Sequence, residues 1–285
     1  MIPTAFDYER ASSVEEAVHL LQSHKGEARI LAGGHSLLPL MKLRLASPAV
    51  LVDIGGIQDL KGIAVEGKDL VVGALTTHSE LSRDERVKKN LPLLAEAAGL
   101  IGDLQVRNRG TVGGNLAGAD PASDLPAVAL ALEARLMVEG PQGAKEIPME
   151  DFILGPLLTA LGPDEVVRAV RFPIPAETWK GAYAKFEHPA SGYAAAGAAV
   201  VLLLDEGGTI KEARVAITGA ADMAYRARAV EEALKGEKAD EEVFTRAAEQ
   251  AAEGASFSGD LFASGDYRRH LAQVYTRRAL RKAVS

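Results

Sequence analysis

Two pairs of adjacent glycines constrain this chain more than any other feature. The first pair lies in Ala32-Gly33-Gly34-His35-Ser36, directly after the apolar segment 28–31, and the second lies in Gly110-Thr111-Val112-Gly113-Gly114-Asn115. Because glycine has no Cβ, paired glycines let backbone N–H groups converge on an anion such as a pyrophosphate. Either pair alone is more typical of an ordinary tight turn. Two such loops, both flanked by hydroxyl or amide side chains, favour a nucleotide site.

Composition excludes several classes of protein. A net charge of −7 argues against a nucleic-acid partner, because nucleic-acid binding needs a basic footprint. The chain has no cysteine, so it cannot ligate an iron–sulfur cluster, and its histidines show no zinc-ligand spacing. No apolar run is long enough to span a membrane, and the first ten residues do not resemble a signal peptide. We therefore expect no transmembrane segment and a cytoplasmic protein.

Hydrophobic periodicity indicates an α+β chain. Ser12 and Ser13, followed by Glu15 and Glu16, form overlapping capping-box patterns that open an amphipathic helix. Further along, the pattern predicts an alanine-rich helix ending at Glu133. The predicted strands lie at 28–31, 49–54, 63–66, 69–73, 135–139, 165–172, 181–187, 194–204 and 209–218. Three helices are predicted at 225–235, 240–253 and 265–283.

Two prolines in Phe172-Pro173-Ile174-Pro175 end a strand and stiffen a link, which makes this segment the best candidate for a domain boundary.

Three common nucleotide-binding or catalytic motifs are absent from the sequence. No two glycines have the i, i+2 spacing of the Rossmann fingerprint, and neither the P-loop triplet nor G-x-S-x-G occurs. A nucleotide, if one is bound, is therefore held by another kind of cradle, and hydrolase chemistry has no support.

Three segments carry a resemblance to a known family. They are 32–39, 110–115 and 120–126, the last with the sequence Asp120-Pro121-Ala122-Ser123-Asp124-Leu125-Pro126. Together they resemble the FAD-binding medium subunits of the molybdenum hydroxylases (the xanthine dehydrogenase family), with the aerobic carbon monoxide dehydrogenase medium subunits as the most similar group. The resemblance covers essentially the whole chain.

The resemblance implies a fold and a division into domains. An FAD-binding domain of the PCMH type would occupy residues 1–175, with α+β subdomains of about 1–54 and 55–175. A smaller α+β domain of the carbon monoxide dehydrogenase flavoprotein type would occupy 176–285, with a three-stranded antiparallel sheet and helices.

The resemblance also implies which residues hold FAD. Main-chain N–H groups of 32–36 and 111–115 would bind its diphosphate, helped by the Ser36 and Thr111 hydroxyls and the Asn115 amide. The further positions that match the family are Ile101 beside the flavin, Asp124 at a sugar or ribityl hydroxyl, Leu161 near the isoalloxazine edge, Lys185 at the diphosphate or a flavin oxygen, and Tyr193 over one flavin face.

The residues by themselves also allow plainer roles at these positions. Ile101 and Leu161 read as core residues, Asp124 as the N-cap of a helix at Pro126, and Lys185 as an exposed strand lysine. Tyr193 at the start of a strand is commonly structural.

By resemblance, the chain is an electron-transferring oxidoreductase subunit with no catalytic residue or metal of its own. Its expected partners are a small subunit with [2Fe-2S] clusters and a large subunit with molybdopterin, assembled as a dimer of heterotrimers. A peripheral location at the inner face of the membrane, through this complex, stays open beside the cytoplasmic one. FAD would pass electrons to a quinone or NAD⁺. Two alternatives stay open: a self-sufficient FAD oxidoreductase, and a non-redox module that binds FAD or another nucleotide.

Overall fold

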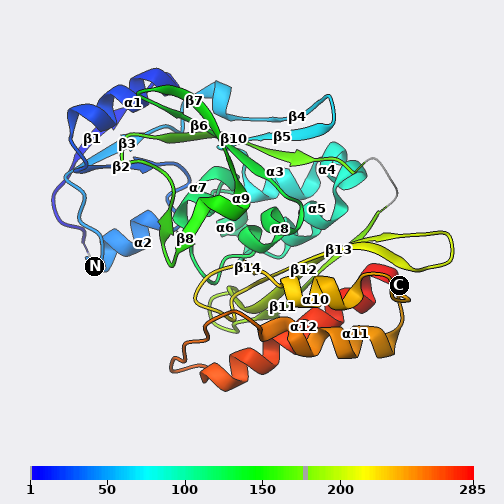
Figure 1. Cartoon of the computed structure of the whole chain (residues 1–285). Helices are drawn as coiled ribbons and strands as arrows, with labels where there is room; N and C mark the ends of the chain where they lie inside the picture. The colour runs from blue at the N-terminus through cyan, green and yellow to red at the C-terminus, as the bar shows by residue number, and fades with distance from the viewer. Residues whose placement is uncertain (1, 176–178) are drawn as a thin grey trace.

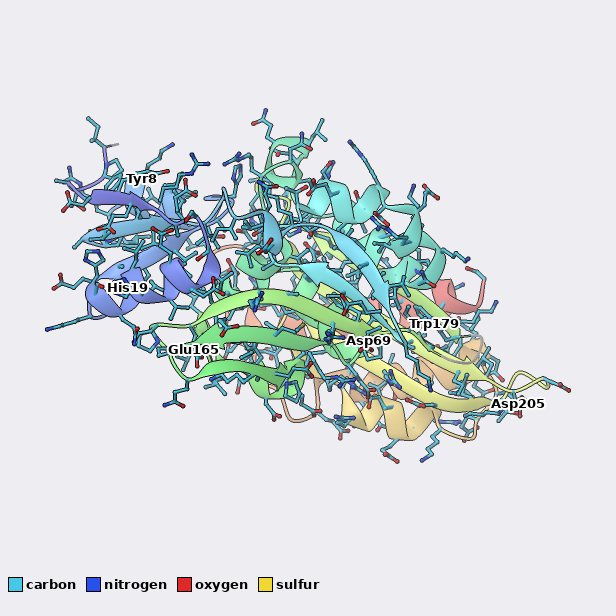
Figure 2. The ribbon with its side chains drawn as sticks, turned by 90° about the horizontal axis from the view of Figure 1, so that it is seen from above. Tyr8, His19, Asp69, Glu165, Trp179 and Asp205 are labelled. Atoms are coloured by element: carbon cyan, nitrogen blue, oxygen red, sulfur yellow. The ribbon has the colours of Figure 1, made fainter. Side chains whose placement is uncertain are left out.

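The computed structural model describes residues 2–175 and 179–285. Within these residues, three sheets follow one another along the chain, with three, five and four strands, and a two-stranded ribbon is inserted into the second (Figure 1). Seen from above, Tyr8 of the first sheet and His19 of the helix after its first strand lie at one end of the molecule, and the turn at Asp205 lies at the other (Figure 2). The predicted start of the second domain at residue 176 lies outside the described residues.

The first sheet is parallel, with the order β1-β3-β2. Its strands are β1 (Asp7–Arg10), β2 (Ala28–Leu31) and β3 (Val50–Asp53), and helices α1 (Val14–Ser23) and α2 (Leu37–Lys42) connect them. One of the two overlapping capping patterns is used: the Ser13 hydroxyl accepts a hydrogen bond from the Glu16 N–H, 3.1 Å away. The predicted strands 28–31 and 49–54 are confirmed, whereas β1 was not predicted, because its sequence carries no apolar alternation.

The second sheet is antiparallel, with the order β4-β5-β10-β6-β7. Its strands are β4 (Ile63–Glu66), β5 (Asp69–Gly73), β6 (Arg135–Gly140), β7 (Gly143–Pro148) and β10 (Val166–Pro173). The ribbon consists of β8 (Ile153–Gly155) and β9 (Leu158–Thr159). Strands β7, β8 and β9 were not predicted; β7 is largely exposed, and the other two are three residues or shorter.

Most helices of this region lie between β5 and β6 in the chain. They are α3 (His78–Arg83), α4 (Glu85–Asn90), α5 (Pro92–Gly99), α6 (Leu104–Arg107), α7 (Val112–Gly118) and α8 (Leu125–Ala131), followed later by α9 (Met149–Phe152); a 3₁₀ turn, η1 (Gln58–Leu60), precedes β4. All seven residues of α8 are buried, which suits a helix that is apolar on every side.

The last sheet is antiparallel, with the order β11-β12-β13-β14. Its strands are β11 (Trp179–Glu187), β12 (Ala194–Leu204), β13 (Ile210–Thr218) and β14 (Tyr225–Arg226). The three predicted strands are confirmed, and the two-residue β14 adds a fourth. The predicted helix 225–235 is wrong at its start, because Tyr225 and Arg226 pair with β13 and α10 (Arg228–Leu234) begins after them. Helix α11 (Glu241–Ala248), η2 (Glu249–Ala252) and α12 (Gly265–Val284) complete the chain.

The last sheet packs through both of its faces. Ala199 and Ala216 contribute to the same apolar core as α5, α8 and strands of the second sheet, whereas Ala198 and Ile217 pack against α10, α11 and α12. Helices α5 and α8 therefore lie between two sheets (Figure 1). Small side chains along β12 make close packing on both faces possible. Among the described residues, no helix combines the length and the apolarity needed to cross a membrane.

Candidate cofactor site

The two glycine loops lie against each other. A Cβ built on Gly33 would lie 2.1 Å from the carbonyl oxygen of Arg109 and 3.1 Å from the Gly110 Cα. Further along the second loop, a Cβ on Gly114 would lie 3.9 Å from the Ala32 Cβ. The two loops are about 80 residues apart in sequence, and the absence of a side chain at Gly33 is what allows this backbone contact.

The second loop is fastened to the segment that joins β5 to α3. The Val112 N–H donates to the Thr76 carbonyl and the Gly113 N–H to the Ala74 carbonyl, both at 2.9 Å. Gly113 is required here, because a Cβ would lie 2.5 Å from the Ala74 Cβ. The Thr111 hydroxyl caps α7 by accepting from the Gly114 N–H at 3.2 Å. These contacts make the second loop a rigid support.

The backbone amides of the two loops differ in availability. Each amide of residues 112–115 already donates to an acceptor within the chain. By contrast, none of the amides of Gly33, Gly34, His35 and Ser36 donates a hydrogen bond to any described residue. Gly34 has a φ of +75°, which favours glycine and turns the loop. The arrangement fits a diphosphate: free N–H groups without a Cβ nearby lie in the first loop, beside the Thr111 hydroxyl of the second.

Tyr193 lies next to the first loop, although it comes from the connection between β11 and β12. Burial and the nearby Asp120 and Asp124 raise the pKa of Tyr193, and the nearby Ser36 side chain partly offsets this. The Tyr193 side chain is still 40% exposed. An aromatic ring held beside the loop and open on one side can stack on a flat ring system.

The neighbouring Gly192 joins this connection to the region of Ile101. A Cβ on Gly192 would lie 3.1 Å from the Gly102 Cα, so the connection and the segment after α5 touch. Ile101 itself is 7% exposed and belongs to the apolar core. Leu161 packs on the same core and follows the β8–β9 ribbon, which is tied to the end of α7 by a hydrogen bond from the Leu157 N–H to the Ala119 carbonyl.

Asp124 and Lys185 form a buried ion pair. The Lys185 ammonium lies 3.0 Å from Asp124 Oδ2, each side chain is 4% exposed, and the ammonium also donates to the Leu100 carbonyl at 2.9 Å. The simpler roles for both residues are wrong. Asp124 stands at the N-cap position of α8, but its side chain caps no amide, and Lys185 is not an exposed strand lysine. Burial raises the pKa of Asp124, and Lys185 partly offsets this.

Sequence reasoning missed Tyr183, which completes this buried group. Its hydroxyl donates to Asp124 Oδ1 at 2.7 Å. The signal was available in outline, since alternation along β11 puts Tyr183 and Lys185 on the same face of the strand.

His78 was also missed. It is 2% exposed, its buried Nδ1 has no hydrogen-bond partner among the described residues, and burial lowers its pKa to about 4. Its backbone N–H donates to the Gly110 carbonyl at 3.0 Å, and its ring lies against the Gly110 Cα. No periodic signal in the sequence marks this histidine as buried.

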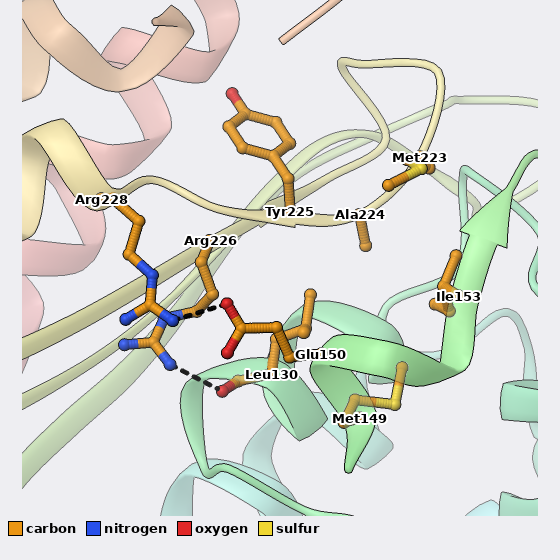
Figure 3. Close-up of a pocket in the computed structure, with 9 residues that line it drawn as sticks. All are labelled: Leu130, Met149, Glu150, Ile153, Met223, Ala224, Tyr225, Arg226 and Arg228. Atoms are coloured by element: carbon orange, nitrogen blue, oxygen red, sulfur yellow. Dashed lines mark hydrogen bonds and ion pairs between the residues drawn. The ribbon is translucent and has the colours of Figure 1, made fainter. Parts of the chain in front are cut away.

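A small cavity lies elsewhere, between the β7–α9 region and β14. It has a volume of about 170 Å³ and is lined by apolar residues such as Met149 and Met223, with Glu150 and Arg228 at its edge (Figure 3). None of its lining residues belongs to the predicted site, so this cavity does not bear on the glycine loops.

Comparisons with known proteins agree over the whole chain. Residues 4–175 match the family of FAD binding domains in molybdopterin dehydrogenase, and residues 181–283 match the carbon monoxide dehydrogenase flavoprotein C-terminal domain. The carbon monoxide dehydrogenase medium chain of Hydrogenophaga pseudoflava is 42% identical over 283 residues, covering 99% of this chain and 98% of that protein. The 6-hydroxypseudooxynicotine dehydrogenase complex subunit alpha of Paenarthrobacter nicotinovorans is 35% identical, covering 100% and 96%.

A solved structure gives the same result. A chain of the carbon monoxide dehydrogenase from Hydrogenophaga pseudoflava which lacks the Mo-pyranopterin moiety of its cofactor superimposes with a TM-score of 0.96 at 44% identity, covering 100% of this chain and 99% of that chain.

Proposed function

The chain belongs to the FAD-binding medium subunits of the molybdenum hydroxylase family, and from this premise we propose that it relays electrons within a larger complex. FAD is the cofactor of this family, and the chain is an oxidoreductase subunit. Its relatives are named as subunits of larger enzymes, so partner subunits are implied. The proposal adds the direction of transfer: electrons come from [2Fe-2S] clusters of a small subunit and leave to a quinone or NAD⁺.

The observation that carries the proposal is the set of free amides at Gly33 to Ser36, packed against the second glycine loop. These amides and the Thr111 hydroxyl would hold the diphosphate of FAD. Tyr193 would cover one face of the flavin ring, with Ile101 and Leu161 as apolar neighbours. Asp124 and Lys185 would lie beside polar groups of FAD. Bound FAD would supply the redox chemistry, accepting electrons singly and delivering two to the acceptor.

The protein residues would bind, orient and shield the cofactor. The chain has no cysteine to ligate a cluster, and we identify no motif in it for molybdopterin, so both groups are assigned to partner subunits. We propose a dimer of heterotrimers, as the family resemblance implies. The substrate of the whole enzyme is left open, because the relatives act on chemically different compounds.

We also propose the domain division 1–175 and 176–285, with subdomains of about 1–54 and 55–175. Three facts support it: β10 ends at Pro173, the two family matches end at 175 and start at 181, and the first parallel sheet ends at Asp53.

The decisive experiment is co-expression of the full chain with its neighbouring reading frames. We expect a complex that contains iron, sulfide and molybdenum, with about one FAD per copy of this chain after acid extraction, and a flavin that is reduced when the complex receives its substrate. A homomer that is catalytically complete would favour the self-sufficient oxidoreductase. A flavin that binds but is not reduced by the partners would favour the non-redox module. Absence of FAD from the purified complex would overturn the proposal.

A further inference from the structure

Tyr183 connects the last sheet to the candidate cofactor site through one fully buried hydroxyl. It lies on β11, is 0% exposed, and donates to Asp124 Oδ1 at 2.7 Å across the contact with α8. The phenol fills a niche that depends on Gly197 of β12: a Cβ there would lie 2.2 Å from the hydroxyl oxygen. The hydroxyl therefore has a single defined position.

The backbone of Tyr183 is held as firmly as its side chain. Its N–H donates to Glu96 Oε2 of α5 at 3.1 Å, and its carbonyl accepts from the Lys282 ammonium of α12 at 3.2 Å. Lys282 and Glu96 also form an ion pair with each other. Helices α5 and α12 thus fix the backbone of the residue that holds Asp124.

Asp124 keeps acceptor capacity after these contacts. A carboxylate offers about four lone-pair sites, and Tyr183 and Lys185 each use one, on different oxygens. With both oxygens held, the carboxylate cannot rotate. Lys185 also binds the Leu100 carbonyl, directly before Ile101, so the same group fixes the segment expected to lie beside the flavin.

We propose that Tyr183 is a positioning residue of the cofactor site. Its hydroxyl holds the Asp124 carboxylate beside Lys185, so that a remaining lone pair of this carboxylate accepts a hydrogen bond from a hydroxyl of bound FAD. This proposal rests on the proposed function, because it needs FAD at the glycine loops. It extends the site to a residue of the last sheet that would not touch the cofactor.

The charges around Asp124 give the proposal a pH signature. Burial raises the pKa of Asp124, while Lys185 and the Tyr183 hydroxyl lower it; Glu187, also on β11, raises it. Asp120 is also close to this group, because Asp120 and Asp124 both raise the pKa of Tyr193. Deleting the Tyr183 hydroxyl removes one group that stabilises the carboxylate, so the Asp124 pKa rises. If FAD needs the ionised carboxylate, affinity will then begin to fall at a higher pH.

The test is Tyr183→Phe in the full chain within its complex, with FAD affinity measured from acid to neutral pH. We expect FAD to bind at least about tenfold more weakly at neutral pH, because the Asp124 carboxylate is no longer held where it accepts a hydrogen bond from FAD. We also expect the acid limb of the curve of FAD affinity against pH, where affinity falls with falling pH, to move to higher pH. Tyr225→Phe is the matched control, because Tyr225 donates to the Ala251 carbonyl inside the last domain, and it should leave both quantities unchanged.

The outcomes separate this proposal from the proposed function. If the wild-type complex binds no FAD, the proposed function fails. If wild type binds FAD and Tyr183→Phe matches it in affinity and acid limb, only the positioning role fails. Gly197→Ala gives a second route, because it displaces the hydroxyl without deleting it. We expect it to weaken FAD binding in wild type and to add little in the Tyr183→Phe background; full additivity of the two changes would contradict the proposal.

Discussion

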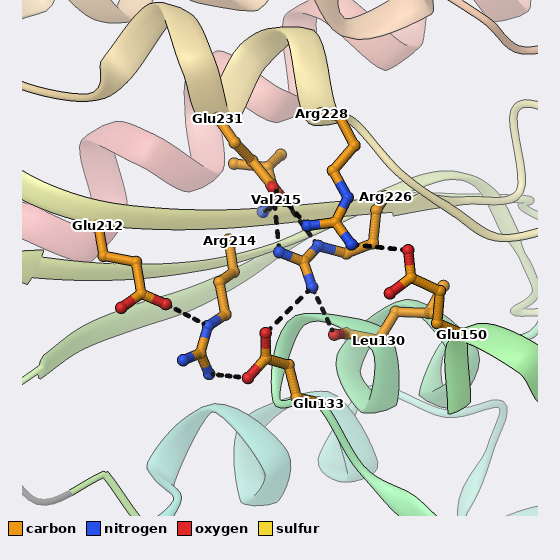
Figure 4. Close-up of polar contacts among 9 residues, drawn as sticks. All are labelled: Leu130, Glu133, Glu150, Glu212, Arg214, Val215, Arg226, Arg228 and Glu231. Atoms are coloured by element: carbon orange, nitrogen blue, oxygen red, sulfur yellow. Dashed lines mark hydrogen bonds and ion pairs between the residues drawn. The ribbon is translucent and has the colours of Figure 1, made fainter. Parts of the chain in front are cut away.

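Arg226 and Glu231 form a two-point ion pair where the last sheet meets the helix α8. Arg226 Nε lies 2.6 Å from Glu231 Oε1 and Nη2 lies 3.0 Å from Oε2, with side chains 6% and 9% exposed. The same guanidinium reaches the Leu130 carbonyl and Glu133, and Glu231 also accepts from the Val215 N–H (Figure 4). This pair links β13, β14 and α10 to the end of α8, so it secures the contact through which Tyr183 and Lys185 reach Asp124.

Replacing Arg226 should therefore be costly. In Arg226→Met, the buried Glu231 carboxylate loses its main cation, and we expect the free energy of unfolding to fall by about 3–5 kcal/mol. Arg228 provides the control, since it also contacts Glu231 but is 54% exposed, and its other partner Glu150 is 60% exposed. Arg228→Met should cost about 1 kcal/mol or less. Urea unfolding of both variants checks this, and equal losses would show that burial does not set the difference.

Gly33→Ala should empty the cofactor site without unfolding the chain. A Cβ at this position would collide with the Arg109 carbonyl, so the first loop must move away from the second. We expect FAD content per chain to fall severely while the circular dichroism spectrum is retained. Gly118→Ala is the matched control: it lies in α7, a Cβ there meets no atom of the described residues within 4 Å, and alanine favours a helix by up to about 1 kcal/mol. If Gly33→Ala keeps the wild-type FAD content, the first loop is not part of the cofactor site.

The sequence predicted the framework of this fold better than its details. Strong apolar runs such as 194–204 and clear turns such as Gly67-Lys68 gave the correct strands. The short β8, β9 and β14 have too few residues to show a period, and pairing with neighbours decides them. At the site, glycine pairs identified the loops, but which amides stay free depends on the partners Ala74 and Thr76. Alternation along β11 marks Tyr183 only in outline, and the burial of His78 depends wholly on tertiary contacts.

His78 should make stability depend on pH. Burial, with smaller contributions from Arg107 and His35, lowers its pKa from 6.5 to about 4 in the folded chain. Between these values the unfolded chain binds a proton that the folded chain does not, so stability falls as the pH falls from 6.5 to 4. The loss should total about 3 kcal/mol and end near pH 4, where both states are protonated.

The measurement for His78 is the free energy of unfolding of wild type and His78→Asn across this pH range. The variant should lack this part of the slope. His19→Gln, on the exposed face of α1, should keep the wild-type slope. A slope in His78→Asn equal to that of wild type would assign the pH dependence to other groups.

Lys185→Met should destabilise the chain in a way that a second substitution repairs. The single change leaves the Asp124 carboxylate buried without its cation, and we expect a loss of about 3–5 kcal/mol near neutral pH. The loss of Lys185 raises the pKa of Asp124 further in the folded chain. The deficit should therefore be small in acid, where Asp124 is protonated in both states, and grow as the pH rises above the ordinary range of an aspartate.

Lys185→Met with Asp124→Asn should recover most of the stability, because no buried charge is left. Lys88→Met, in the exposed pair with Glu85, is the control and should change stability by about 0.5 kcal/mol or less at every pH. Urea unfolding of the FAD-free chain checks all three variants, and a deficit in Lys185→Met that does not vary with pH would show that lost packing, rather than the unpaired carboxylate, causes it.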